Sequence, residues 1–220
     1  MIWSVAGGLL WAGMSILNPH AVWGLGWWAL VSGMLLSHLG MVEGEDGSRR
    51  ENLGTPNALT LSRAWAVPAV ALLVGVPWAF ATLLAAAAVT DVLDGHLARA
   101  GGQTRLGAHM DHGVDTALTI TAAIGAAAAG WMPWWLAWIV AARYAGPIIG
   151  LAAIYFATAR QPLREAFVRG RIPGGLVLLG LALVTVDQTR LAGGALIAAG
   201  AMLGVVALVT SAARSVRVAR

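Results

Sequence analysis

Long apolar segments fill most of this chain and decide what it can fold into. After a polar stretch at 43–55, hydrophobic residues are nearly continuous over 57–75, 77–97, 105–129, 133–157, 171–187 and 192–213. Each of these segments is close to the ~20 residues that an α-helix needs to cross a bilayer. Lipid offers the backbone no hydrogen-bond partners, so such segments form helices. We therefore predict an all-α fold, a polytopic membrane helix bundle with a six-helix core.

Two further apolar segments precede the polar stretch. Residues 2–17 and 21–42 are separated by Asn18-Pro19-His20, which predicts an apolar helical hairpin. Residues 2–17 are short for a full span, so an interfacial helix marked by Trp3 and Trp11 is the alternative. A positively charged n-region and a small-residue cleavage site are both missing, so we do not expect a removable signal peptide. The domain prediction is an N-terminal hydrophobic hairpin and polar linker at 1–54, followed by a membrane core at 55–220.

Composition and charge exclude several classes of protein. With 59% hydrophobic and 11% charged residues, the chain is not an ordinary soluble domain, and with no cysteine it has no disulfide or thiol chemistry. The net charge of +4 comes from arginine alone, because the sequence contains no lysine. The arginines lie at the ends of apolar segments, which is typical of topology signals. We expect membrane lipids as partners and no nucleic acid.

The positions of these arginines predict an orientation. If the six core segments cross the membrane in turn, most arginines at or beyond their ends fall on one face of the membrane, and only Arg190 falls clearly on the opposite face. The arginine-rich face carries Arg49, Arg50, Arg99, Arg105, Arg160, Arg164, Arg169, Arg171, Arg214, Arg217 and Arg220. By the positive-inside rule, the arginine-rich side is cytoplasmic. We predict a multi-pass protein of the cell membrane whose connection between the second and third core segments faces the cytoplasm.

That connection lies within an unusually acidic stretch. Four of the ten acidic residues are Asp91, Asp94, Asp111 and Asp115. The first two are three residues apart and the last two are four apart, so each pair shares one face of a helix. A break at Gly101-Gly102 lets the two pairs face each other. Carboxylates inside apolar segments need a cation, and oxygen ligands at this density suit Mg²⁺ or Mn²⁺. Ion pairs that only stabilise the bundle are the alternative, but Arg99 and Arg105 leave an excess of negative charge.

The acidic stretch resembles the signature of the CDP-alcohol phosphotransferase (CDP-alcohol phosphatidyltransferase) family, D-x2-D-G-x2-A-R followed by G-x3-D-x3-D. All eight fixed positions are matched, by Asp91, Asp94, Gly95, Ala98, Arg99, Gly107, Asp111 and Asp115. One departure is the gap of seven residues between Arg99 and Gly107, one fewer than the usual spacing. A second motif, T-P-N-A-L-T-L-S-R from Thr55 to Arg63, is similar to the opening of the first core helix in this family.

The resemblance implies an enzyme of phospholipid synthesis, a transferase of substituted phosphate groups. It would move a phosphatidyl group from a CDP-alcohol, with CDP-diacylglycerol as the expected donor, to an alcohol acceptor and release CMP. It implies Mg²⁺ or Mn²⁺ held by Asp91, Asp94, Asp111 and Asp115. The cytidine and pyrophosphate would bind among Asn57, Thr60, Gly95, Arg99 and Thr104, and Arg63 is also suited to phosphate contacts. Asp115 would act as the general base.

The acceptor is less constrained. Arg143 lies inside the fourth core segment, where a charged side chain faces the bundle interior or a wet cavity, so we expect it to bind a phosphate of the acceptor. Pairing of Arg143 with a motif carboxylate is the alternative. The opening motif looks like the branch that uses glycerol 3-phosphate, but His112 and Thr116 depart from that branch. Inositol phosphate, another phosphatidyl acceptor, and a CDP-alcohol donor other than CDP-diacylglycerol stay open.

Two further expectations concern class and assembly. A metal- or proton-coupled transporter would also place carboxylates in a membrane, but it would carry them near the bilayer centre on broken helices of two related repeats, and no such repeat is visible. Gly200-x3-Gly204 permits close helix packing, and we expect a homodimer.

Overall fold

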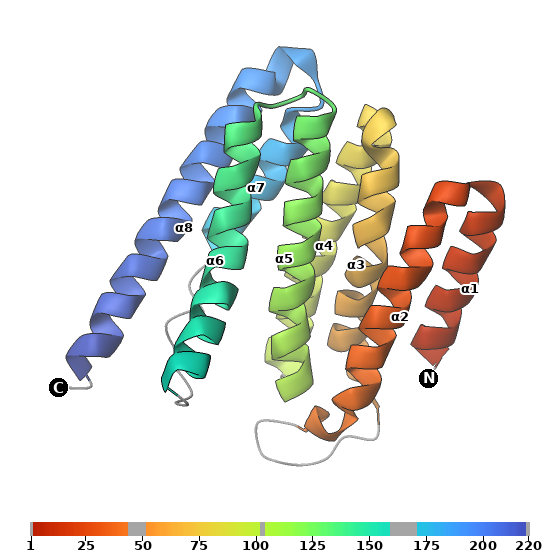
Figure 1. Cartoon of the computed structure of the whole chain (residues 1–220), viewed down its shortest axis with the longest axis horizontal. Helices are drawn as coiled ribbons and strands as arrows, with labels where there is room; N and C mark the ends of the chain where they lie inside the picture. Colours follow the sequence, from red (N-terminus) through yellow and green to blue (C-terminus); the bar gives the residue numbers. More distant parts are fainter. Residues whose placement is uncertain (1, 44–51, 102–103, 159–170, 219–220) are drawn as a thin grey trace. The chain divides into compact units, whose positions relative to one another are not determined.

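The computed structural model describes residues 2–43, 52–101, 104–158 and 171–218 (Figure 1). Inside these ranges the description omits the side chains of residues 94, 95, 98–101, 105, 108, 109, 151–155, 157, 158, 171, 172 and 208–218. Every regular element in the described residues is a helix. The prediction of an all-α fold is therefore confirmed.

Each predicted segment corresponds to one helix. The N-terminal hairpin consists of α1 (Ile2–Leu17) and α2 (Val22–Ser37), with the short 3₁₀ turn η1 (Pro19–Ala21) between them. The six core helices are α3 (Gly54–Leu72), α4 (Pro77–Gly101), α5 (Arg105–Ala128), α6 (Trp134–Thr158), α7 (Arg171–Leu183) and α8 (Arg190–Val218). Further 3₁₀ turns are η2 (Leu39–Met41), η3 (Leu73–Gly75) and η5 (Asp187–Thr189).

Local sequence signals account for several helix ends. α4 begins at Pro77, whose fixed φ and missing N–H suit a first helical position. Thr104 caps α5, because its Oγ1 accepts a hydrogen bond from the backbone N–H of Gly107 at 3.0 Å. Gly130 follows α5 with a φ of +74°, and the N–H groups of Gly130 and Trp131 bond back to Ala127 and Ala126. This arrangement is a Schellman motif, and glycine adopts its left-handed residue without strain.

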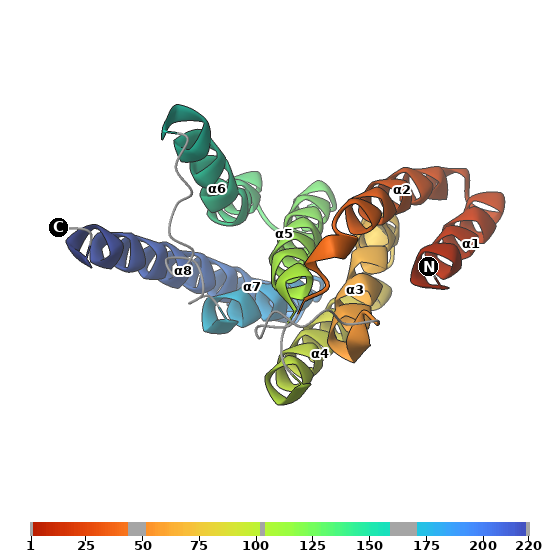
Figure 2. The ribbon, with the colours of Figure 1, turned by 90° about the horizontal axis from the view of Figure 1, so that it is seen from below.

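The chain forms two compact units, Met1–Thr121 and Ala122–Arg220, and each is described by itself. In the first unit, α3 packs between α2 and α4 (Figure 2). Tryptophan side chains connect its helices through backbone carbonyls: Trp27 Nε1 donates to Ala64 O at 2.7 Å, and Trp28 Nε1 donates to Ser4 O at 2.6 Å. The predicted domain boundary between 54 and 55 stays a prediction.

The core of the first unit lies where α2, α3 and α5 meet. Its buried residues are Val31, Leu35, Val42, Leu61, Ala64, Leu106, Met110 and Val114. On α3 and α5 these residues recur at intervals of three or four, which places them on one face of each helix. Packing on this face therefore sets how α3 and α5 are rotated about their own axes.

In the second unit, α7 and α8 cross in close contact. A Cβ added to Gly180 would lie 2.6 Å from the carbonyl oxygen of Gly193, and one added to Gly193 would lie 2.8 Å from that of Gly180. Gly200 is just as tightly placed, 2.7 Å from Pro173 O, and Gly204 lies against the Arg143 guanidinium of α6. The Gly200-x3-Gly204 motif thus packs helices within the chain, and the homodimer stays a prediction.

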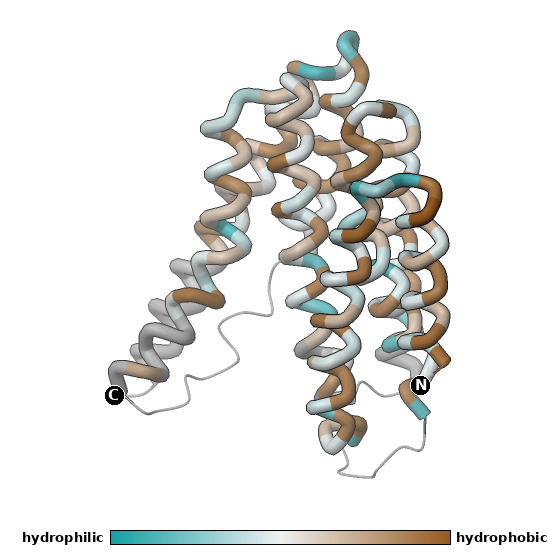
Figure 3. The backbone as a smooth tube through the Cα atoms, turned by 45° about the vertical axis from the view of Figure 1, so that its right-hand side comes forward, coloured by the Kyte–Doolittle hydropathy of each residue, from teal (hydrophilic) through white to brown (hydrophobic). Residues whose placement is uncertain are grey.

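Apolar side chains cover the outside of the helices as well as their packed faces. Hydrophobic colours run along the helices in Figure 3, and leucine, valine, isoleucine and tryptophan side chains on α1, α2, α6 and α8 are exposed. Within the described residues, Gly54–Gly75 and Asp187–Ala207 are long and apolar enough to cross a membrane. Shorter apolar helices occupy Ile2–Leu17, Pro77–Leu93 and Pro173–Leu183.

We predict that Gly24→Ala destabilises the N-terminal hairpin. A Cβ at Gly24 would clash with the indole of Trp11, which is only 2% exposed. Overpacking of this kind costs about 1–3 kcal/mol, so the Tm of the purified protein in detergent should fall by several degrees. Gly26→Ala, on the same helix, is the control: nothing lies within 4 Å of its added Cβ. Its Tm should be unchanged or slightly higher, and equal Tm values for the two variants would contradict the packing described.

Candidate metal and substrate site

Two rows of side chains run along α5. Leu106, Met110 and Val114 form the first row, and they are buried in the core of the first unit. Asp111 and Asp115 form the second row, each one residue after a member of the first. One residue turns an α-helix by about 100°, so the carboxylates project to the side of the apolar row. The packing of α5 therefore fixes the direction of both carboxylates.

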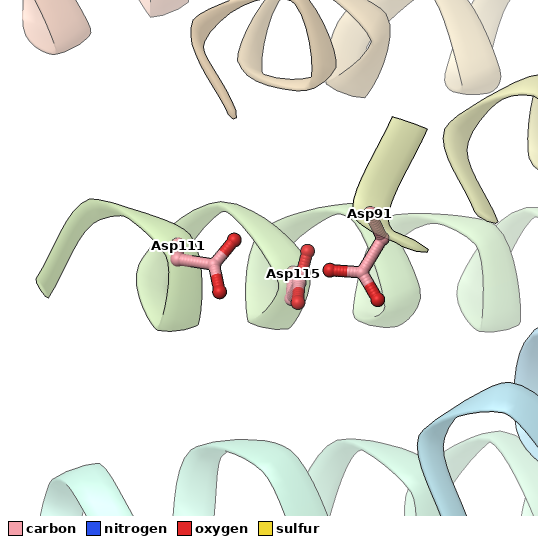
Figure 4. A group of neighbouring side chains, drawn as sticks. All are labelled: Asp91, Asp111 and Asp115. Atoms are coloured by element: carbon pink, nitrogen blue, oxygen red, sulfur yellow. The ribbon is translucent and has the colours of Figure 1, made fainter. Parts of the chain in front are cut away.

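Asp91 of α4 adds a third carboxylate beside this row (Figure 4). One carboxylate oxygen from each of Asp91, Asp111 and Asp115 lies within 4.8 Å of the others. The three side chains are 37%, 34% and 35% exposed, respectively. The structure thus brings together three of the four predicted metal ligands and leaves them half-buried. The fourth, Asp94, lies in α4, but its side chain is outside the described part of the structure.

The three carboxylates fit a hard divalent cation. Mg²⁺ and Mn²⁺ prefer carboxylate oxygens, and Mg²⁺ usually keeps open positions for water or a substrate phosphate. Asp91, Asp111 and Asp115 supply oxygens close enough to share one ion, and their partial exposure leaves access for a ligand. The donor chemistry therefore supports the metal prediction and does not distinguish between the two ions.

Arg63 of α3 reaches the same carboxylates. Its Nη1 donates to Oδ1 of Asp91 at 3.0 Å and also to Oδ1 of Asp115. Its Nη2 donates to Oδ1 of Asp111 at 2.5 Å. The Arg63 side chain is only 2% exposed. A buried guanidinium is costly unless anionic partners surround it, and here it has carboxylates from two other helices.

The motifs alone did not place Arg63 in the acidic cluster. Sequence reasoning assigned it to nucleotide or phosphate contacts, because it follows Asn57 and Thr60 in the opening motif. A usable signal was present. Arg63 lies well inside an apolar segment, and the motif aspartates are the acidic residues that other apolar segments contain away from their ends. A cation at that depth needs an anion, so charge balance favours a pairing of Arg63 with the cluster.

Asn57 and Thr104 meet at the start of α5. Asn57 is 4% exposed, and its Nδ2 donates to Thr104 Oγ1 at 2.9 Å and to Leu53 O at 2.6 Å. Its Oδ1 lies so close to Gly107 that an added Cβ would overlap it. Glycine is therefore needed at Gly107 because Asn57 fills the space of a side chain. This contact ties the first turn of α3 to the first turn of α5.

Of the remaining predicted nucleotide contacts, the structure describes the side chain of Thr60 only. Thr60 is 3% exposed, and its Oγ1 donates to the carbonyl of Pro56 at 3.3 Å within α3. Gly95 and Arg99 lie in α4, but their side chains are outside the described residues. The basic connection at 159–170 is likewise outside them.

Arg143 belongs to the second unit, on α6. Its Cζ lies 4.4 Å from the centre of the Tyr144 ring, and its guanidinium lies against Gly204 of α8. Its Nε and Nη1 atoms are buried, and within the described part of the chain they have no hydrogen-bond partner. Arginine nitrogens in this state suit an anionic ligand, because each can still donate a hydrogen bond.

Comparison with known proteins identifies a family. Residues 53–211 match the family model described as CDP-alcohol phosphatidyltransferase, which is well over half of the chain. Comparison with curated protein sequences gives no match. The matched range includes α3, α4 and α5, and with them Arg63 and the three clustered carboxylates. The chain therefore belongs to the CDP-alcohol phosphatidyltransferase family, whose members are transferases of substituted phosphate groups that take a phosphatidyl group from a CDP-alcohol.

Proposed function

We propose that this protein transfers the phosphatidyl group of CDP-diacylglycerol to a small alcohol acceptor and releases CMP, a step of phospholipid synthesis. The observation that carries the proposal is the group of three carboxylates from α4 and α5, with oxygens within 4.8 Å of one another. The family assignment favours this transferase over the transporter alternative. The same assignment supports a membrane enzyme, for which we propose a multi-pass arrangement, a cytoplasmic active site and a homodimer.

The acidic cluster is proposed to hold the donor's diphosphate through one or two divalent ions. Asp91, Asp94, Asp111 and Asp115 are the proposed ligands, and Mg²⁺ or Mn²⁺ bound there would neutralise charge on the diphosphate. Arg99, also on α4, is proposed to contact a phosphate directly, because a guanidinium can donate two parallel hydrogen bonds to phosphate oxygens.

The nucleotide is proposed to bind beside the first turns of α3 and α5. Thr60, Gly95 and Arg99 line the proposed site together with Asn57 and Thr104. Asn57 and Thr104 are buried and bonded to each other, which suits a role in fixing the shape of this edge. Gly95 has no side chain, so a ligand can approach the backbone closely at this position.

Asp115 is proposed as the general base. It would accept the proton of the acceptor hydroxyl as that oxygen forms a bond to the phosphorus carrying the diacylglycerol. The bond from this phosphorus to the bridging oxygen of the diphosphate breaks, and CMP leaves with the electron pair. Asp115 is 35% exposed and one helical turn from Asp111, so an acceptor can approach it beside the proposed metal ligands.

The acceptor is proposed to carry a phosphate, with glycerol 3-phosphate as the first candidate and inositol phosphate as the second. Support comes from Arg143, whose buried Nε and Nη1 atoms lack a hydrogen-bond partner within the described residues. A phosphate would accept a hydrogen bond from one of these donors. An acceptor without a phosphate would leave this part of the proposal without a role for Arg143.

Asp115→Asn should abolish turnover. Replacing the carboxylate with an amide removes the proton acceptor and keeps the size of the side chain, so CMP release should fall by about 10²–10⁴-fold. Binding of CDP-diacylglycerol, measured on the same detergent-solubilised protein with Mg²⁺ present, should persist. Asp187→Asn is the matched control, because Asp187 is 81% exposed and pairs with Arg190 outside the site. Near-normal CMP release by Asp115→Asn would exclude Asp115 as the base.

Arg143→Met should weaken use of a phosphorylated acceptor. CMP release is measured with CDP-diacylglycerol against glycerol 3-phosphate, inositol 1-phosphate, inositol and serine. With the active phosphorylated acceptor, we expect KM to rise at least about tenfold, because a buried charge-assisted contact is lost. Arg190→Met, which removes an arginine that is 40% exposed, should leave this KM unchanged. An unchanged KM in Arg143→Met, or activity only with inositol or serine, would contradict the proposed contact.

A further inference from the structure

Arg63 lies at the centre of the acidic cluster and comes from a helix that carries none of the proposed metal ligands. It is 2% exposed, and it donates hydrogen bonds to Oδ1 of all three clustered carboxylates. These partners lie 28, 48 and 52 residues away in sequence. One side chain of α3 therefore joins α4 and α5 through the same three carboxylates that lie close enough to share a metal ion.

Charge balance explains why a cation belongs at this position. Carboxylates with oxygens within 4.8 Å of one another repel, and the water around these half-buried groups screens that repulsion only in part. Arg63 neutralises part of that charge and leaves the three described carboxylates and the guanidinium with a net charge of −2. This remaining charge matches one divalent ion.

We propose that Arg63 is a built-in counter-cation, which holds the carboxylates together and competes with the divalent ion for them. The inference rests on the metal site of the proposed function. It assigns Arg63 as a positioning residue that also weakens metal binding, so that the ion exchanges readily and binds best together with the negatively charged diphosphate.

Geometry supports the competition. Divalent ions of this size bind carboxylate oxygens at about 2.0–2.2 Å. The Nη1 of Arg63 is 3.0 Å from Oδ1 of Asp91, so an ion bound to that oxygen would lie within about 5 Å of this nitrogen. Two positive groups at that separation repel each other, because water screens a half-buried site only in part. Loss of the guanidinium should therefore strengthen metal binding, even though it weakens the protein without metal.

Two substitutions and a control test the proposal on the full-length protein in detergent. Arg63→Met removes the charge and keeps most of the length of the side chain. Arg63→Lys keeps a positive charge but loses the planar fork that contacts several carboxylates. Arg190→Met removes an arginine from the exposed ion pair with Asp187. The Kd for Mn²⁺ without substrate is measured by electron paramagnetic resonance of the free ion after metal removal, and Tm is measured with and without Mn²⁺.

For Arg63→Met we expect a Kd for Mn²⁺ at least about tenfold lower than in the unsubstituted protein, within the range common for coupled sites. Its Tm without metal should be lower, and saturating Mn²⁺ should raise its Tm by more than it raises that of the unsubstituted protein. The Kd of Arg63→Lys for Mn²⁺ should lie between those of Arg63→Met and the unsubstituted protein. Arg190→Met should have the same Kd as the unsubstituted protein. A merely structural role would lower Tm without strengthening Mn²⁺ binding.

The outcomes separate this inference from the proposed function. An unchanged or higher Kd in Arg63→Met would overturn the competition and leave the metal site standing. If Arg63→Met can be isolated only with Mn²⁺ present, the ion replaces the guanidinium as the inference requires. If it cannot be isolated at all, Arg63→Lys decides, and a Kd at or above that of the unsubstituted protein would overturn the proposal. Failure of the unsubstituted protein to bind Mn²⁺ would remove the metal site itself.

Discussion

The ion cluster between Arg63 and three aspartates is the interaction on which the rest of the site depends. A buried guanidinium and half-buried carboxylates are each unfavourable alone, but together they neutralise one another across three helices. Losing one partner of such a group costs about 3–5 kcal/mol when fully buried, and somewhat less here because the carboxylates are partly hydrated. The charges that serve the proposed chemistry therefore also hold α3, α4 and α5 in register.

Local sequence patterns predicted where the helices lie in the sequence and which residues share a helix face. Apolar segments predicted the eight α-helices of the described residues, and a spacing of four put Asp111 and Asp115 on one face of α5. The pairing of Arg63 with the cluster could not be read in the same way, because contacts over 28 to 52 residues leave no periodic trace. The same reason hides the contact between Asn57 and Thr104, two residues that are 47 positions apart in the sequence.

The site combines rigid and accessible parts in one short region. Asn57, Thr104 and Gly107 are buried and packed against one another, so the first turns of α3 and α5 stay together. Asp111 and Asp115 follow on the same helix and are about one-third exposed. A family whose members move a charged phosphatidyl group needs both properties, because the ligands must be positioned firmly while substrates reach them from outside.

The two rows on α5 also limit how this segment can change during evolution. Conservative substitutions within the apolar row Leu106, Met110 and Val114 alter volume and leave the direction of the helix faces intact. Inserting or deleting one residue between Gly107 and Asp111 would instead rotate everything beyond it by about 100° relative to the cap at Thr104. Either the carboxylates or the apolar row would then face the wrong surroundings. Length is therefore constrained more tightly than composition over this part of the helix.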